Sequence, residues 1–165
     1  MKDEVVFEIR ASWPRRLIAY ATLLFIGGFG VYLAFSGAEI STTSKLLSIV
    51  AGCAALAFAE WFRRATAGVI RLTREDLRDA DGNQLCRIEQ IEKVDRGAFA
   101  LKPNGGFVLR LSGGAPVQWA PGMWWRIGRS FGVGGVTDRH LSKAVAEYLA
   151  LAVAERDKPK DDETP

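Results

Sequence analysis

Two long apolar runs dominate the hydrophobic pattern of the first half of the chain. Residues 17–35 contain no charged side chain, and residues 46–59 contain none either, whereas Arg, Asp and Glu recur through the remainder. A helix rises about 1.5 Å per residue and the hydrocarbon core of a bilayer is about 30 Å thick, so a span needs roughly 20 apolar residues. The first run, and the second extended over residues 46–62, come close to that length. The pattern predicts a transmembrane helical hairpin over residues 15–64.

Two alternatives stay open for these runs. A cleaved signal peptide is the main alternative for the first run, although residues 17–35 are longer than a typical signal core and follow a polar segment. Two buried helices of a soluble protein are the other, although a 165-residue chain has little other surface to cover two helices that are apolar all round. No charge lies at mid-span, so a channel or transporter is disfavoured.

Arginine and tryptophan flank the outer ends of the predicted hairpin. The residues expected to anchor it at the membrane interface are Trp13, Arg15, Arg16, Trp61, Arg63 and Arg64. The segment between the two runs carries only Glu39 and Lys45 as charged residues. Because Lys and Arg are enriched in cytoplasmic flanks, both ends of the hairpin, and so both termini, are expected on the cytoplasmic side.

Small residues recur in both runs at a four-residue spacing, as in Gly30 and Ala34 or Ala55 and Ala59. Such spacing lets membrane helices approach closely. Packing within the hairpin and homo-oligomer formation are both compatible with it.

From residue 65 the pattern changes to short alternating segments broken by Gly, Pro and Asn, which predicts a β-rich domain over residues 65–156. The expected strands are residues 69–73, 76–79, 84–88, 91–96, 98–102, 107–111 and 117–119. Turns are expected at residues 81–83, 103–106, 113–114 and 121–122.

A final helix is expected to close this sheet. Thr137 and Asp138 are good N-cap residues, and the helix should run to about Arg156. Its apolar stripe consists of Leu141, Val145, Tyr148, Leu149 and Ala152. In the cytoplasmic segment 1–14, residues 5–10 alternate like an edge strand of the same sheet, whereas the charged tail 157–165 predicts disorder. The fold class is therefore α+β.

A hairpin followed by short strands and one C-terminal helix resembles the bacterial pleckstrin-homology-like membrane proteins. The resemblance lies in residues 71–79 with Gly82 and in the I-x-x-I-x-x-V run of residues 88–94. The chain also resembles small proteins of this layout in which Pro-Gly-x-Trp-Trp-Arg, here residues 121–126, precedes a Gly-Val-Gly-Gly turn. The resemblance implies the bacterial inner membrane and a binding or scaffolding module. Headgroup ligation in some members needs a basic cluster, whereas residues 74–78 alternate Arg with acidic residues.

Two groups of residues are candidates for a site. A loop-like segment suits a membrane interface or a partner surface, unless one of its tryptophans fills the core, and its residues are Met123, Trp124, Trp125, Arg126 and Arg129. The weaker group would present backbone N–H groups to an anion before the last helix, and it consists of Gly132, Gly134, Gly135 and Arg139. A tight turn feeding the helix is the simpler interpretation of these glycines.

Several function classes are disfavoured. The net charge of +3 comes from scattered residues, so we expect no nucleic-acid partner. Cys53, Cys86 and the single histidine, His140, provide neither a disulfide framework nor a metal set, and we expect no cofactor. No catalytic motif is found. The first hypothesis is a non-enzymatic membrane-anchored module with a protein partner. The second is a lipid-headgroup or anion sensor that uses residues 124–139, and the third is an enzyme acting on a membrane substrate.

Overall fold

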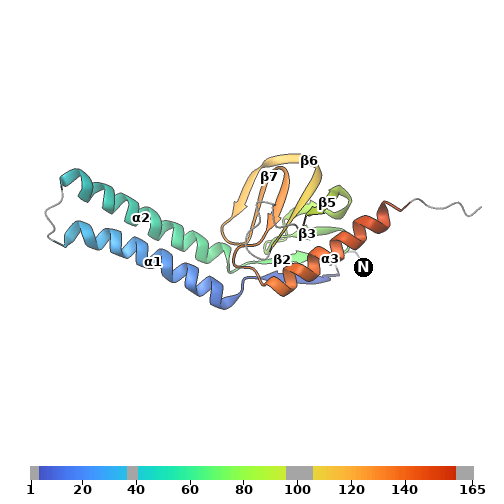
Figure 1. Cartoon of the computed structure of the whole chain (residues 1–165), viewed down its shortest axis with the longest axis horizontal. Coiled ribbons are helices and arrows are strands. Elements are labelled where there is room, and N and C mark those ends of the chain that lie inside the picture. The colour runs from blue at the N-terminus through green and yellow to red at the C-terminus, as the bar shows by residue number, and fades with distance from the viewer. Residues whose placement is uncertain (1–3, 37–40, 96–105, 159–165) are drawn as a thin grey trace, which may run out of the picture.

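The structure is a computed structural model that describes residues 4–36, 41–95 and 106–158. Its elements are β1 (Phe7–Arg10), α1 (Trp13–Phe35), α2 (Thr42–Ala65), β2 (Val69–Leu72), β3 (Asp76–Arg78), β4 (Gln84–Arg87), a 3-10 turn (Ile88–Gln90), β5 (Ile91–Asp95), β6 (Phe107–Ala120), β7 (Trp124–Val133) and α3 (Arg139–Arg156). Two long helices project from a domain of two antiparallel sheets and a closing helix (Figure 1). The predicted α+β class is confirmed.

The helical hairpin is inserted between two paired strands of one sheet. β1 leads into α1, and α2 leads back into β2. The two strands are antiparallel, with Phe7 opposite Leu72 and Arg10 opposite Val69. The predicted edge strand at the N-terminus is therefore present, and the outer ends of α1 and α2 must lie side by side.

Glycines allow α1 and α2 to pack closely against each other. A Cβ atom on Gly52 would lie 2.8 Å from the carbonyl oxygen of Gly27, and one on Gly27 would lie 2.7 Å from Cγ of Leu56. Gly28, in contrast, faces open space. The small residues at these contacts thus serve packing within the hairpin, and homo-oligomer formation stays a prediction.

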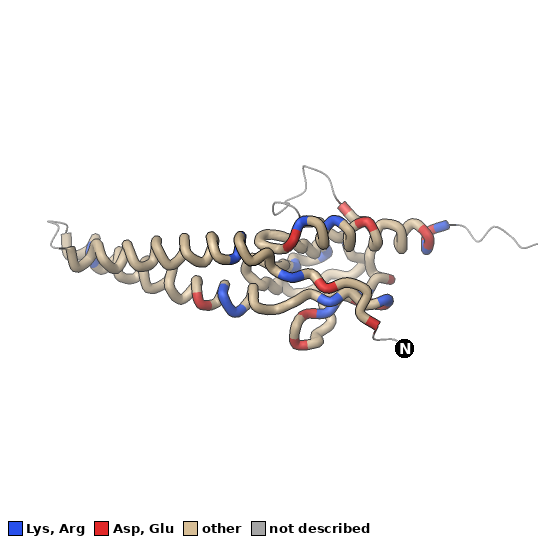
Figure 2. Tube along the Cα trace, turned by 90° about the horizontal axis from the view of Figure 1, so that it is seen from below, with Lys and Arg blue, Asp and Glu red and all other residues tan. Residues whose placement is uncertain are grey.

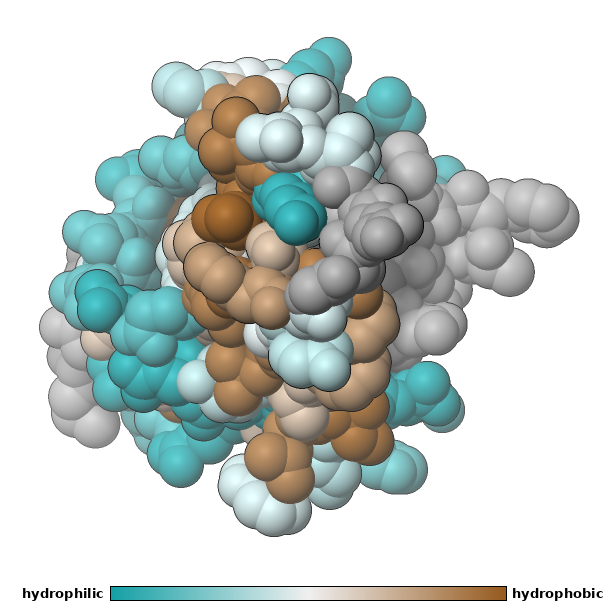
Figure 3. All heavy atoms as spheres, turned by 90° about the vertical axis from the view of Figure 1, so that its left-hand side faces the viewer, coloured by the Kyte–Doolittle hydropathy of each residue, from teal (hydrophilic) through white to brown (hydrophobic). Residues whose placement is uncertain are grey.

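Most of the hairpin surface is apolar and exposed. Both helices are long and apolar enough to cross a membrane, and only 11% and 17% of their most apolar windows are buried within the protein. Charged positions gather around the domain and the base of the hairpin (Figure 2), and apolar surface fills the middle of the view along the hairpin (Figure 3). These helices are therefore not the buried core helices of a soluble domain. A cleaved signal peptide is disfavoured as well. Cleavage after residues 17–35 would remove β1 and with it Ile9, which is fully buried in the domain core.

The domain core lies between the two sheets and α3. The strand order is β1-β2-β3-β4 in one sheet and β5-β6-β7 in the other. Helix α3 contacts β1 and β5, and the rings of Phe7 and Tyr148 meet edge to face at 5.8 Å. The predicted helix start is confirmed, because the Asp138 carboxylate accepts hydrogen bonds from the backbone N–H groups of His140 and Leu141. The predicted stripe also faces the core, since Val145 and Leu149 are fully buried, although Leu141 is exposed.

The predicted turn at residues 113–114 is wrong, because β6 runs through it. Arg110 pairs with Ser130 and the next pair is Ala115 with Gly128, so β6 holds more residues than β7 between them and forms a bulge. Gly128 has a φ of +56°, which suits the opposite side of this bend. Gly113 and Gly114 therefore bend the β6–β7 hairpin and do not reverse the chain.

Other sequence predictions for the domain have mixed outcomes. The turns at residues 81–83 and 121–122 are confirmed, whereas the predicted loop at residues 124–129 is the first half of β7, because it pairs with the end of β6. Residues 117–119 are the end of β6 and not a separate strand. The predicted strand at 98–102, the turn residues 103–105 and most of the tail lie outside the described residues.

Candidate functional site

The start of β7 divides the predicted Trp–Trp–Arg segment between two faces. Trp124 packs against Phe131 at a ring distance of 5.7 Å, and Nη1 of Arg126 donates to the carbonyl oxygen of Leu85 at 2.7 Å, so both side chains turn inward. Trp125 pairs with Trp119 across the strands and lies on the outer face. Each tryptophan is half-buried, one on each face.

Met123 is not available to a partner or a bilayer, because it is 2% exposed and belongs to the core. Its N–H donates to Ala120 and its carbonyl oxygen accepts from Gly134, which folds the turn back over the domain. The prediction of Met123 as a surface residue is therefore wrong. Arg129 of β7 donates to the carbonyl oxygen of Leu111 and forms an ion pair with Glu92 at 2.7 Å.

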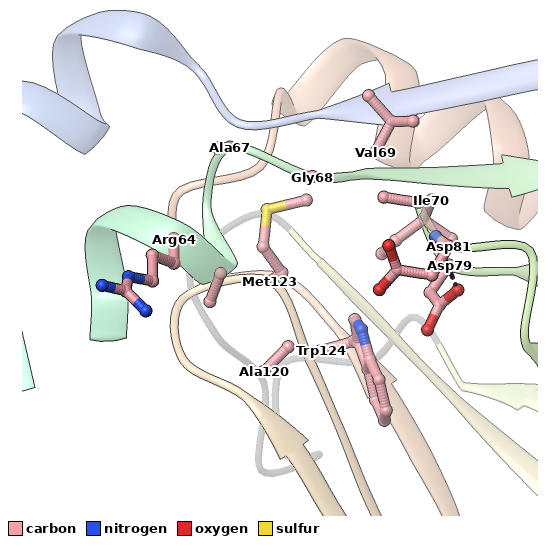
Figure 4. Close-up of a pocket in the computed structure, with 12 residues that line it drawn as sticks. Arg64, Ala67, Gly68, Val69, Ile70, Asp79, Asp81, Ala120, Met123 and Trp124 are labelled. Atoms are coloured by element: carbon pink, nitrogen blue, oxygen red, sulfur yellow. Dashed lines mark hydrogen bonds between the residues drawn. The ribbon is translucent and has the colours of Figure 1, made fainter. Parts of the chain in front are cut away.

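A pocket of about 380 Å³ lies where α2 meets the domain, and we call it the junction pocket. The end of α2, the start of β2, the β3–β4 turn and the β6–β7 turn line it. Figure 4 shows Arg64 on one side, Asp79 and Asp81 on the opposite side, and Met123 and Trp124 between them. The pocket thus has an apolar centre and a rim of opposite charges.

The rim charges differ in how firmly they are held. Arg64 forms an ion pair with Glu60 at 2.6 Å on the exposed side of α2. The Asp79 carboxylate accepts from the backbone N–H groups of Asp81 and Asn83, so it stabilises the β3–β4 turn. The exposed Asp81 uses only its backbone N–H in that contact. Asp81 is therefore the rim charge best placed to meet a bound group.

The predicted interface anchors gather at the base of the hairpin. Nη1 of Arg15 donates to the carbonyl oxygen of Thr137, and Nη2 of Arg16 donates to that of Arg63 at 3.0 Å. Arg63 and Arg64 both pair with Glu60. Trp13 is 71% exposed. The described anchors thus form one band of cations and an exposed indole beside the domain.

A tryptophan that the sequence did not single out joins this band. The indole of Trp119 lies edge to face on Trp61 of α2 at 5.1 Å and 6.0 Å from the ring of Phe58. Only the fold brings these residues together, because 58 positions separate Trp61 from Trp119 along the chain. Alternation in β6 gave no reason to choose Trp119 over its neighbours.

The predicted anion site at the start of α3 does not form. The N–H of Gly134 donates to Met123, and the ring of Trp125 covers Gly132. Gly135 packs against the β6–β7 turn, and Asp138 supplies its own carboxylate to the helix N-terminus, which leaves Arg139 exposed beside it. The Gly134 donor and the first N–H groups of α3 therefore already have partners, and the Asp138 charge would repel an anion there.

The buried ionisable groups of the domain have structural roles. Burial raises the pKa of Asp76, but hydrogen bonds from Thr73, Gln84 and Arg78 outweigh it and hold that pKa below its usual range. Burial raises the pKa of the Cys86 thiol to about 12, which keeps it from acting as a nucleophile near neutral pH. Within residues 4–36, 41–95 and 106–158, no three His, Cys, Asp or Glu side chains are grouped so that they could hold a metal ion.

These features define a class of protein: an α+β domain with an exposed apolar helical hairpin between its first two strands and a mixed-charge pocket at the junction. No protein-family model matches the chain, and neither a curated protein nor a solved structure matches it.

Proposed function

We propose that the chain is a membrane-anchored binding module and not an enzyme. Helices α1 and α2 cross the bilayer, and the domain lies with both termini at its cytoplasmic face. The insertion of the hairpin between β1 and β2 is the observation that supports this most directly. Because these strands are paired, the outer ends of the two helices share one side of any membrane that the helices cross.

The charge distribution supports the cytoplasmic side for the domain. Arg15, Arg16, Arg63 and Arg64 lie at the base of the hairpin, whereas Lys45 is the one charged residue near its far end among those described. The resemblance to bacterial pleckstrin-homology-like membrane proteins points to the bacterial inner membrane as the location.

The junction pocket is the surface best suited to a protein partner. Its centre offers the half-buried ring of Trp124, and its rim carries Arg64, which is paired with Glu60, opposite the exposed Asp81. A polypeptide segment with an apolar side chain between residues of opposite charge complements this arrangement, whereas a simple anion would meet both attraction and repulsion. A protein ligand is therefore favoured over the anion-sensor alternative, whose expected donor at Gly134 is already bonded and whose helix N-terminus is capped by Asp138.

Thiol labelling in intact cells tests the topology. We expect Ser41→Cys, in a Cys53→Ser background, to react with a membrane-impermeant maleimide added outside. Ala154→Cys, at the end of α3 furthest from the hairpin (Figure 1), should react only after lysis. Labelling of Ala154→Cys in intact cells, or protection of Ser41→Cys until lysis, would count against the proposed orientation.

A photo-crosslinking residue at Ala80, on the rim of the junction pocket, tests the partner. In the native cells we expect one adduct of defined mass, lost on Asp81→Lys and kept on Glu155→Lys, a charge reversal on α3. The same crosslinker at Ala154 should give no such adduct. No adduct at Ala80, or one insensitive to Asp81→Lys, would remove the pocket from the proposal.

A further inference from the structure

A second apolar surface lies on the outer face of the bent β6–β7 hairpin. Val117 is 72% exposed, Trp119 50% and Ile127 57%, and with Trp125 they line a hollow of about 510 Å³. Large exposed apolar side chains that cluster in this way mark a surface that contacts something else. We call these four residues the outer face.

Strand alternation explains why these side chains share one face. Trp119 lies opposite Trp125, and Val117 and Ile127 each lie two residues away from these tryptophans along their own strands. Gln118 and Ser130 also line the hollow, whereas Arg126, between Trp125 and Ile127, turns to the other face. The hydrogen bond from Arg126 to Leu85 identifies that other face as the inner one. The outer face is therefore a consistent feature of the paired strands and not a set of unrelated exposed residues.

The outer face continues the apolar surface of the helical hairpin. Trp119 contacts Trp61 and Phe58 near the end of α2, where the predicted span meets the interface. In Figure 3 apolar surface is also visible towards the top of the view, the side on which Figure 1 has β6 and β7. A bilayer around the hairpin would thus reach Trp119 without any change in the fold.

Polarity along this side of the sheet changes in the order found across a bilayer interface. Trp125 also lines a second hollow of about 220 Å³, together with Lys93, Arg110 and Asp95. Lys93 and Arg110 are paired between β5 and β6. The apolar residues of the outer face are therefore followed by Trp125 and then by the cations Lys93 and Arg110. The negative charge of Asp95 reduces the net charge of this group to +1. Acyl chains, the headgroup boundary and anionic headgroups favour these residue types in the same order.

We propose that the outer face inserts into the interfacial layer of the bilayer. Val117, Trp119 and Ile127 reach the first carbons of the acyl chains, next to the headgroups, and Trp125 lies at the headgroup boundary. The domain then touches the membrane at a third place, beside the two helices. This inference rests on the proposed membrane anchoring. Lipid is favoured over a protein partner for this surface, because Trp119 of the outer face contacts Trp61 of α2. A bilayer that surrounds the helical hairpin therefore also reaches the outer face.

Depth-dependent quenching in the full chain tests the proposal. A polarity-sensitive fluorophore is attached at Val117→Cys or Ile127→Cys in a Cys53→Ser background, and each protein is reconstituted at low density into phosphatidylethanolamine and phosphatidylglycerol vesicles. The buried Cys86 is not labelled. We expect blue-shifted emission that headgroup-depth quencher lipids quench more strongly than deep ones. A label on the native, exposed Cys53 should show the reverse order, and Ala154→Cys should be quenched by neither.

The controls separate this inference from the function that it rests on. If the Cys53 label is not quenched by lipid, the hairpin is not inserted and the proposed function fails. If Cys53 is quenched but both outer-face labels behave like Ala154→Cys, the outer-face proposal alone is wrong. Blue-shifted outer-face labels that lipid does not quench, with disulfide-linked dimers of Val117→Cys, would assign the face to a second copy and would equally overturn it.

Discussion

Replacing single hairpin glycines by alanine tests the packing of α1 against α2 with the smallest possible change. The three positions form a graded series. An added Cβ atom would lie 2.8 Å from the Gly27 carbonyl oxygen at Gly52 and 3.3 Å from the Ser48 carbonyl oxygen at Gly30, and it would meet nothing within 4 Å at Gly28. All three lie in helix interiors, so their backbone cost is comparable and Gly28 serves as the matched control.

Two terms of opposite sign set the expected magnitudes. Overpacking of a close contact costs about 1–3 kcal/mol, and Gly→Ala in a helix interior contributes about 1 kcal/mol of stability. The Gly52 contact is with backbone atoms of α1, which can yield only if the helices move apart, so the first term dominates there. We expect Gly52→Ala to destabilise the protein by about 1–2 kcal/mol, Gly30→Ala to be near neutral and Gly28→Ala to stabilise it by up to about 1 kcal/mol.

Thermal unfolding in a mild detergent measures the series, with the folded protein followed by size-exclusion chromatography after heating. For a chain of this size, each kcal/mol shifts the midpoint by about 2–4 °C, so Gly52→Ala should lower it by about 2–8 °C. The order of the three variants is the decisive result. Equal midpoints for Gly52→Ala and Gly28→Ala would refute the packing of the helices through Gly52.

Three further predictions concern the domain and its contact with α2. Asp76→Ala should lower the free energy of unfolding by about 2–3 kcal/mol in urea titrations, because a charged acceptor of three side-chain hydrogen bonds is lost. The pKa of Asp76 is lower in the folded state than in the unfolded state. Its contribution to the free energy of unfolding is therefore fully present above the unfolded pKa of about 4 and is lost as the pH falls through the folded pKa. The unfolding of Asp76→Ala should accordingly be less sensitive to acid than that of the parent protein. A small uncharged thiol reagent at pH 8 in detergent should modify Cys86 only on unfolding, and prompt reaction of Cys86 would contradict its burial. A double-mutant cycle on Trp61 and Trp119 should give a coupling of about 0.5–1.5 kcal/mol, and additivity would mean that the two rings do not interact.

Local patterns were sufficient for most helices and strands. The apolar runs at residues 17–35 and 46–62 are long and continuous, so their helices needed no tertiary information. Gly113 and Gly114 show the limit, because a glycine pair suits a reversing turn and a bulge equally well. The pairing of β6 with β7 decides between them, and pairing depends on residues far along the chain.

The candidate surfaces were less predictable because they depend on contacts between distant residues. The unusual composition around Trp125 drew attention to this segment, but it did not indicate that Met123 and Trp124 face inward while Trp125 faces outward. The junction pocket and the Trp61–Trp119 contact both require α2 to end beside the β6–β7 turn. Neither residue spacing nor hydrophobic pattern carries that information.

The junction itself limits how the domain can move relative to the membrane. The backbone N–H of Ser12 donates to Val136 at 2.6 Å, and that of Asp138 donates to Arg10 at 3.0 Å, so the start of α1 is bonded to the segment before α3. The β6–β7 turn approaches the end of α2, where a Cβ atom on Gly122 would clash with the ring of Phe62. A domain on a flexible linker could swing freely, whereas tilting this one would break contacts at both helices. Under the proposed topology, the junction pocket is therefore held at a fixed height above the bilayer. A partner segment close to the membrane surface, such as the flank of another membrane helix, would meet it without an ordering cost for the domain.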